Sequence, residues 1–108
     1  MFLLQPSKHH GVGVFTTESF PRGARLALFR PDDWRFVRAP RGELRRWCQR
    51  FGVADGDGYH CPRHWNRMSI GWYLNHSPRP NVRMRGMSAL AVRALRAGEE
   101  LTVDYGAL

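Results

Sequence analysis

Asn75 and His76 stand where an apolar segment, residues 72–74, gives way to a stretch that is broken twice by proline. Pro78 and Pro80 lack amide donors and restrict the residue before each of them, so neither a helix nor a strand continues through them. We therefore expect the amide and the imidazole to lie in a tight, partly buried turn. Polar groups in such a place need hydrogen-bond partners, which can be backbone, water or a ligand.

Gly11 and Gly13, with Val12 between them, form a second segment that could contact a ligand. Glycines one residue apart let a backbone approach a ligand closely and present its amides to an anionic group. The segment does not open a helix, so the phosphate-binding mechanism of dinucleotide-binding folds does not apply to it. Taken alone, the pair indicates only a tight turn.

Tyr105, between Asp104 and Gly106, follows a predicted short strand. A tyrosine in this position can fill a core with its ring while its hydroxyl stays in water. It can also direct the hydroxyl into a site, as a hydrogen-bond partner or as a general acid or base. The residue types alone leave both interpretations open.

Cys48, His60, Cys61 and His64 include the ligand types of a zinc site. Cys48, however, falls on the apolar stripe of a predicted helix, and the chain has no paired Cys-x2-Cys halves, so we predict no metal site. A catalytic cysteine is disfavoured as well, because neither cysteine has a recognisable activating context. We expect buried free thiols, as in a reducing compartment, while the sequence leaves a disulfide open.

The spacing of apolar residues predicts a mainly β fold. Short strands are expected at residues 2–4, 14–17, 25–29, 35–37, 59–61, 81–85, 88–94 and 101–103. Residues 68–74 fit either a strand or a short helix. The fold class is therefore one of many short strands with little helix.

One amphipathic helix interrupts these strands. Leu44, Trp47, Cys48 and Phe51 stand at i, i+3, i+4 and i+7, with polar residues between them. This spacing predicts a stripe buried in the core. Gly52 is expected to end the helix as a left-handed C-terminal cap.

Length and composition allow one folded domain of 108 residues with 43% hydrophobic content. No apolar run approaches the roughly 20 residues that span a membrane, and the first residues lack the basic start of a signal peptide, so we expect a cytoplasmic protein. The net charge is +8, with sixteen arginines and one lysine. The arginines fit a GC-rich bacterial genome, and they also fit a surface for nucleic acid or another acidic partner, although no nucleic-acid motif accompanies them.

In their order and spacing, these motifs resemble the SET-domain lysine methyltransferases. The resemblance rests on Gly-x-Gly-Val-Phe at 11–15, Tyr-Leu-Asn-His-Ser-x-x-Pro-Asn at 73–81 and Ala-Gly-Glu-Glu-Leu-Thr-x-Asp-Tyr-Gly at 97–106. It covers nearly the whole chain, so residues 1–108 are predicted to form a single SET domain. Residues 30–70 would be the insert that varies among such domains.

The resemblance implies a β-clip fold of short curled strands, in which the C-terminal segment threads under a loop like a pseudoknot. This threading would bring Asn75 and His76 beside Tyr105. The implied reaction is the transfer of a methyl group from S-adenosylmethionine to a lysine side chain of a protein substrate. By analogy, Tyr105 is the essential tyrosine, whose hydroxyl orients the attacking amine.

The same resemblance assigns the cofactor contacts. The backbone at Gly11, Val12 and Gly13 would hold the methionine part of S-adenosylmethionine, while Asn75 and His76 would hold its adenine and amino ends. The substrate lysine would enter from the opposite face through a narrow channel.

Two further positions match the substrate channel of the family. Tyr73 falls at a position that is usually aromatic, and we favour a packing role for it. Val103 stands where relatives often carry the Phe or Tyr that sets the number of methyl groups transferred, so the degree of methylation is open.

The chain also departs from the family pattern. Pro78 replaces a cysteine, and the sequence ends three residues after Tyr105, so a cysteine-rich extension that binds zinc and covers the cofactor is not expected. Small members of the family without this extension sometimes dimerise, so a homodimer is one expectation.

Two other functions compete with the methyltransferase. One is a SET-like binding module that has lost efficient catalysis. The other is a small basic β domain that binds nucleic acid, in keeping with the charge and the aromatic residues. Asn75, His76 and Tyr105 favour the methyltransferase, because the nucleic-acid hypothesis predicts nothing about them. The sequence does not identify the protein substrate.

Overall fold

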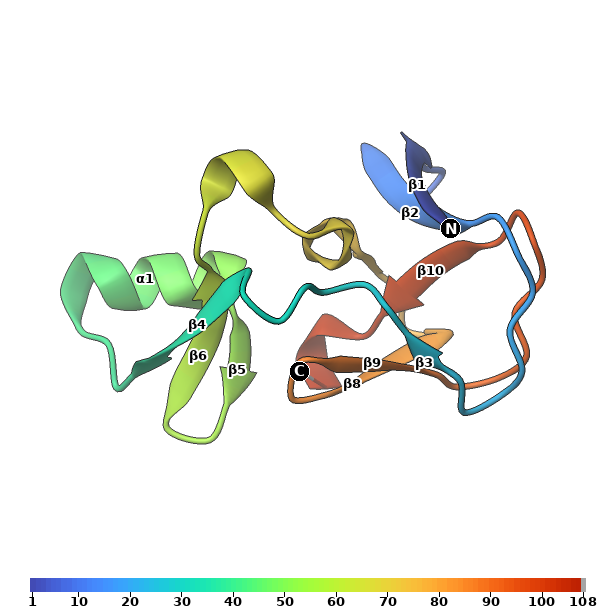
Figure 1. Cartoon of the computed structure of the whole chain (residues 1–108). Helices are drawn as coiled ribbons and strands as arrows, with labels where there is room; N and C mark the ends of the chain where they lie inside the picture. The colour runs from blue at the N-terminus through green and yellow to red at the C-terminus, as the bar shows by residue number, and fades with distance from the viewer. Residues whose placement is uncertain (108) are drawn as a thin grey trace.

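Residues 1–107 fold into three small β-sheets and one α-helix, as Figure 1 shows for the computed structural model. The structure describes these residues without the side chain of Trp65. The molecule is elongated, with principal extents of 41 × 26 × 25 Å. Two sheets lie together, and the third lies beside α1 toward the other end of the molecule. Short 3-10 helices are found at η1 Trp65–Arg67, η2 Ile70–Tyr73 and η3 Tyr105–Ala107.

The sheet that carries the predicted site has the strand order β1-β2-β10-β7. Its strands are β1 Phe2–Pro6, β2 Val12–Thr16, β10 Glu100–Val103 and β7 Asn75–His76. β1 and β2 form an antiparallel hairpin, and β10 lies antiparallel to β2 with Leu101 opposite Val14. β7 runs parallel to β10, with Asn75 opposite Thr102. The late strand β10 is thus inserted between the early hairpin and β7, which confirms the predicted threading.

The second sheet shares a hydrophobic core with the first. Its order is β3-β9-β8, with β3 Arg25–Leu26, β9 Ser88–Ala91 and β8 Val82–Arg85. The ten buried core residues are Val14, Leu26, Leu28, Leu74, Val82, Ala89, Ala91, Leu95, Leu101 and Val103. All of them lie outside residues 30–70. The core is therefore built from segments before residue 30 and after residue 70, with the partly buried Ile70 packed against it.

The strand predicted at residues 25–29 is shorter than expected. It pairs only over Arg25–Leu26, because the amide of Leu28 donates to the carbonyl of Leu26 at 2.9 Å and bends the chain. The bend turns Leu28 into the core, where it is 1% exposed. For residues 68–74 the sequence allowed either a strand or a short helix. Residues 70–73 form the 3-10 helix η2, so the short helix is the correct alternative.

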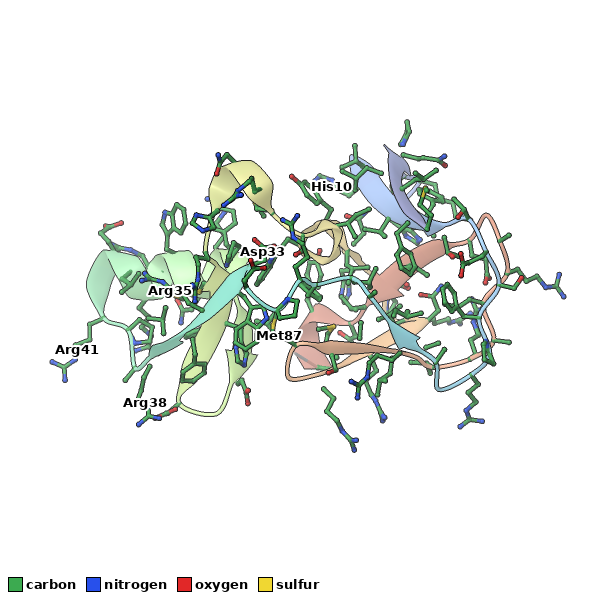
Figure 2. The ribbon with its side chains drawn as sticks, in the orientation of Figure 1. His10, Asp33, Arg35, Arg38, Arg41 and Met87 are labelled. Carbon is green, nitrogen blue, oxygen red and sulfur yellow. The ribbon has the colours of Figure 1, made fainter. Side chains whose placement is uncertain are left out.

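Residues 34–67 build the third sheet and α1. The strand order is β4-β6-β5, with β4 Trp34–Arg38, β5 Val53–Asp55, β6 Gly58–Pro62 and α1 Gly42–Phe51. Figure 2 shows Arg38 and Arg41 at the end of this unit that is farthest from the other two sheets. The unit has its own small buried group, which includes Cys48, Val53 and His60.

The predicted buried stripe of α1 is correct only for Cys48, which is 2% exposed. Leu44, Trp47 and Phe51 are 46%, 48% and 40% exposed. The helical spacing is real, but the three-stranded sheet beneath α1 is too narrow to cover the whole apolar face. The stripe prediction is therefore wrong for these three residues.

Gly52 ends α1, but its left-handed conformation was wrongly predicted. Its φ is −101°, which is extended backbone, and its amide donates to the carbonyl of Cys48 at 2.8 Å. A Cβ at this position would lie 2.9 Å from Sγ of Cys61 and 3.0 Å from the carbonyl oxygen of His60. Glycine is needed here because α1 packs closely against β6, and not because of a positive φ.

Cys48 and Cys61 are free thiols whose sulfur atoms lie 3.4 Å apart. Burial, together with the neighbouring Cys48 thiol, raises the pKa of Cys61 to about 12. Cys61 is thus a protonated thiol at neutral pH and a poor nucleophile. No helix within residues 1–107 is long and apolar enough to cross a membrane.

Candidate active site

Asn75 joins the glycine turn to strand β10. Its Nδ2 lies 3.0 Å from the carbonyl oxygen of His10, 2.9 Å from that of Val12 and 3.0 Å from Oε2 of Glu100. His10 lies in the turn between β1 and β2 and Val12 begins β2, both more than 60 residues earlier in the chain, and Figure 2 labels His10 there. The structure therefore brings Asn75 against the turn that contains Gly11 and the start of β2.

His76 contacts Tyr105 on the other side of β7. The amide of Tyr105 donates to Nδ1 of His76 at 3.0 Å, and the two rings lie with centroids 5.2 Å apart. A ring nitrogen that accepts a hydrogen bond carries no proton. Oδ1 of Asp104 lies 3.7 Å from the same ring nitrogen. The predicted neighbours Asn75, His76 and Tyr105 do lie together.

The Tyr105 hydroxyl is a hydrogen-bond donor in this arrangement. It donates to the carbonyl oxygen of Leu74 at 2.5 Å. Burial raises the pKa of the Tyr105 phenol above its ordinary value of 10.0, although the residue as a whole is 53% exposed. The hydroxyl is thus neutral at physiological pH, and it lies beside a carbonyl that can also accept from a second donor.

The two glycines of the turn are needed for different reasons. Gly11 has φ +48°, and a Cβ there would meet no atom within 4 Å. A Cβ at Gly13 would lie 2.7 Å from the carboxylate carbon of Glu100 and 3.1 Å from Nδ2 of Asn75. Gly11 therefore allows the backbone conformation, whereas Gly13 leaves room for the side chains that meet behind the turn.

We expect Gly13→Ala to disrupt the site and Gly11→Ala only to weaken the fold. The Gly13 methyl group must displace Glu100 or Asn75, so ligand binding at the turn should be lost together with about 2 kcal/mol or more of stability, as for other overpacked sites. Gly11→Ala should cost roughly 1 kcal/mol, the penalty of a left-handed conformation in open space. Urea unfolding of both variants checks this order, and equal costs would contradict the close approach at Gly13.

Asn81 holds β10 by both ends of its amide. Its Nδ2 donates to the carbonyl of Glu100 at 2.8 Å, and its Oδ1 accepts from the amide of Thr102 at 2.9 Å. Asn81 is 4% exposed, and the amide of Ser77 donates to the carbonyl of Val103 at 2.9 Å. The loop from Ser77 to Asn81 therefore wraps β10, the strand that leads to Tyr105. The sequence motif contained Asn81, but nothing in its spacing assigned it this role.

A pocket of about 390 Å³ opens beside Tyr105, on the Val103 face of β10. This volume falls within the range of small-ligand sites. Its walls are mainly aromatic and apolar, and include Phe29, Phe51, Tyr59, Trp72, Val103 and Tyr105. Tyr73 is not among the lining residues and is 38% exposed. Of the two predicted channel residues, the structure places Val103 in this wall and Tyr73 outside it.

Trp72 and Phe29 were not predicted to belong to the site. Their rings pack edge to face with centroids 5.2 Å apart. The indole Nε1 of Trp72 is buried and has no hydrogen-bond partner among the described residues. A buried N–H without a partner is rare in native proteins, and Trp72 itself lines this pocket.

A second pocket, of about 550 Å³, lies on the opposite face of β10. Glu100 and Thr102 line it, whereas Val103 lines the first pocket, because successive side chains of a strand point to opposite faces. Lys8 and Ser77, which flank the glycine turn and the Asn75-His76 segment, line it as well. The strand therefore separates a polar pocket from an aromatic one.

The four residues of the hypothetical zinc site do not converge. His60 lies between the rings of Trp34 and Phe36, and its Nε2 is 2.9 Å from Oδ2 of Asp55. Cys48 and Cys61 contact each other instead. Within the described part of the chain, no three His, Cys, Asp or Glu side chains are arranged to hold a metal ion.

Comparison with known proteins identifies the class to which this fold and site belong. The SET domain family matches residues 11–106, which is most of the chain, so the protein belongs to the SET domain family. Among solved structures, the chain is similar to a candidate histone methyltransferase of Plasmodium falciparum, with a TM-score of 0.69 and 16% identity, over 98% of this chain and 97% of that one. No curated protein sequence matches the chain.

Proposed function

We propose that this protein is an S-adenosylmethionine-dependent protein-lysine N-methyltransferase. The observation that carries the proposal is the position of Tyr105, which contacts His76 through its amide and faces the aromatic pocket. Two pockets then lie on the two faces of β10. Such an arrangement suits a reaction in which a cofactor and a substrate meet from opposite sides. The family membership and the similarity to a candidate histone methyltransferase support the same function.

The residues around the glycine turn fit the cofactor. Gly11 and Val12 are exposed in the turn, and Asn75 offers a polar side chain that is anchored to the turn only through its Nδ2. Residues 11–13 would hold the methionine part, and Asn75 and His76 the amino and adenine ends. When bound, S-adenosylmethionine supplies an electrophilic methyl group on a sulfonium centre.

The aromatic pocket fits the substrate lysine. The amine must be neutral in order to attack, and desolvation by an apolar wall lowers the pKa of an amine. The Tyr105 hydroxyl and the carbonyl of Leu74 lie together at one side of this pocket. These two oxygens can accept hydrogen bonds from the amine N–H groups and direct the nitrogen lone pair along the line of displacement.

Calorimetry with S-adenosylmethionine tests the cofactor half of the proposal. Wild type should bind, and His76→Ala should bind more weakly because the ring that contacts Tyr105 is removed. Circular dichroism must first show that both proteins are folded. A folded wild type that takes up no S-adenosylmethionine would overturn the proposal.

We expect the rate of methyl transfer to rise with pH and to show no decline caused by Tyr105 below about pH 10, the ordinary pKa of tyrosine. Burial raises the pKa of Tyr105, so the protonated hydroxyl is favoured and its ionisation moves to higher pH. The lysine amine, in contrast, becomes a nucleophile as it loses its proton. Initial rates between about pH 7 and pH 10 check this. A falling limb in this range, in protein that stays folded, would contradict the assigned protonation state.

A catalytically weak SET-like binding module is the second candidate, and it predicts cofactor binding without transfer. The homodimer stays a prediction. Gel filtration at working concentrations checks the homodimer. The basic charge of +8 does not favour a lysine-rich tail as substrate, because like charges repel.

A further inference from the structure

Glu100 lies directly behind the glycine turn. Both oxygens of its carboxylate are within 2.8 Å of Oγ of Ser7, and its Oε2 is 3.0 Å from Nδ2 of Asn75. Ser7 also accepts a hydrogen bond from the amide of His9 at 2.9 Å. Glu100 therefore links the residues before the turn to Asn75.

The neighbours of Asn75 fix the direction of its amide. Nδ2 has two hydrogens, but three acceptors lie within 3.0 Å of it: two carbonyl oxygens and the Glu100 carboxylate. All three are acceptors only, so the nitrogen of the amide must face them. The oxygen of Asn75 then faces the other way, and it accepts no hydrogen bond from the described residues.

The carboxylate of Glu100 places a negative charge directly behind the Asn75 amide. Glu100 forms no ion pair among the described residues, and one acceptor near Nδ2 is always left without a hydrogen. In the neighbouring pocket, Arg93 is paired with Glu99 at 3.1 Å, and Lys8, His9 and Arg79 also line it. A ligand with an ammonium group at the Asn75 oxygen supplies the donor that this oxygen lacks.

We propose that Glu100 is a positioning residue for the α-ammonium group of the cofactor. It holds the Asn75 amide so that its oxygen faces the ammonium group, and it supplies the negative charge behind that oxygen. This inference rests on the proposed function, because it assigns a part of S-adenosylmethionine to a part of the same site. Hydrogen bonds to charged groups are stronger than neutral ones, which makes the carboxylate more effective than an amide.

Two ligands distinguish a role of Glu100 toward the α-ammonium group from a merely structural role. S-adenosylhomocysteine carries the α-ammonium group, and 5′-methylthioadenosine lacks the whole amino-acid part. Their affinities are measured by calorimetry for wild type and Glu100→Gln, which keeps the shape and removes the charge. Glu18→Gln makes the same change at a residue that pairs with the N-terminal amine, away from the site.

In Glu100→Gln we expect the affinity for S-adenosylhomocysteine to fall about tenfold or more, the scale of a lost charge-assisted contact. The affinity for 5′-methylthioadenosine should change less than about twofold, and Glu18→Gln should leave both unchanged. Ser7→Ala, which removes the other support of the carboxylate, should show a smaller loss with the same selectivity. This second variant keeps the test informative if Glu100→Gln does not fold.

An equal loss for both ligands, or no loss for S-adenosylhomocysteine, would overturn the role of Glu100. The proposed function would still stand in either case, because wild type binds S-adenosylhomocysteine. If folded wild type binds neither ligand, the proposed function fails and the inference fails with it.

Discussion

Tyr105→Phe should abolish most methyl transfer and leave cofactor binding nearly unchanged. The substitution removes only the hydroxyl that donates to Leu74 and borders the aromatic pocket. The amide of Tyr105, which donates to His76, is kept. We expect the rate to fall by about 100-fold or more, because a positioned hydroxyl or general acid–base group contributes on this scale. The affinity for S-adenosylmethionine should stay within about twofold.

Transfer of a radiolabelled methyl group to proteins of a lysate measures this effect without a known substrate. Tyr73→Phe deletes the same atom from a residue that is 38% exposed and outside the pocket wall, so it tests whether the loss is specific to Tyr105. Label transfer undiminished in Tyr105→Phe would contradict the role given to the hydroxyl. Binding without any transfer by wild type would favour the binding-module hypothesis.

Asn81→Ala should produce the largest loss of stability. The change leaves the carbonyl of Glu100 and the amide of Thr102 without their partners in the interior. Each buried polar group that loses its partner costs about 1–3 kcal/mol, so a total of about 2–6 kcal/mol is expected for the two groups. For a domain of this size, such a loss lowers the melting temperature by tens of degrees or prevents folding.

Urea and thermal unfolding followed by circular dichroism measure this cost. Asn66→Ala is the matched control, because Asn66 is exposed and surface substitutions of this kind usually change stability by less than about 0.5 kcal/mol. A cost for Asn81→Ala below about 1 kcal/mol would show that water replaces the amide at β10.

The sequence predicted the strands of the site well, since β2, β8 and β10 have β-branched or apolar residues at suitable spacing. That Asn75, His76 and Tyr105 lie together was also predicted, but only from the resemblance to the SET-domain family. The partners of Glu100 and Asn81 could not be read from spacing, because their hydrogen bonds join residues that are up to 93 positions apart. Local patterns carry no information about such contacts.

Errors in the prediction have a common physical origin. Helical spacing shows which side chains share one face of a helix, but not whether the neighbouring sheet is wide enough to cover that face. Leu44 and Trp47 are therefore about half exposed on a three-stranded sheet. Gly52 was assigned a positive φ from its position alone, whereas the close approach of β6 requires a glycine there.

The insertion of β10 between β2 and β7 also governs how the protein becomes functional during folding. The hairpin β1-β2 and the pair β8-β9 involve near neighbours in sequence and can form early. Glu100, Thr102 and Tyr105 reach their partners only when the last described strand enters the loop from Ser77 to Asn81. Folding intermediates without β10 would thus lack a binding site altogether. Recovery of cofactor binding during refolding should follow the slowest step, in which contacts distant in sequence close.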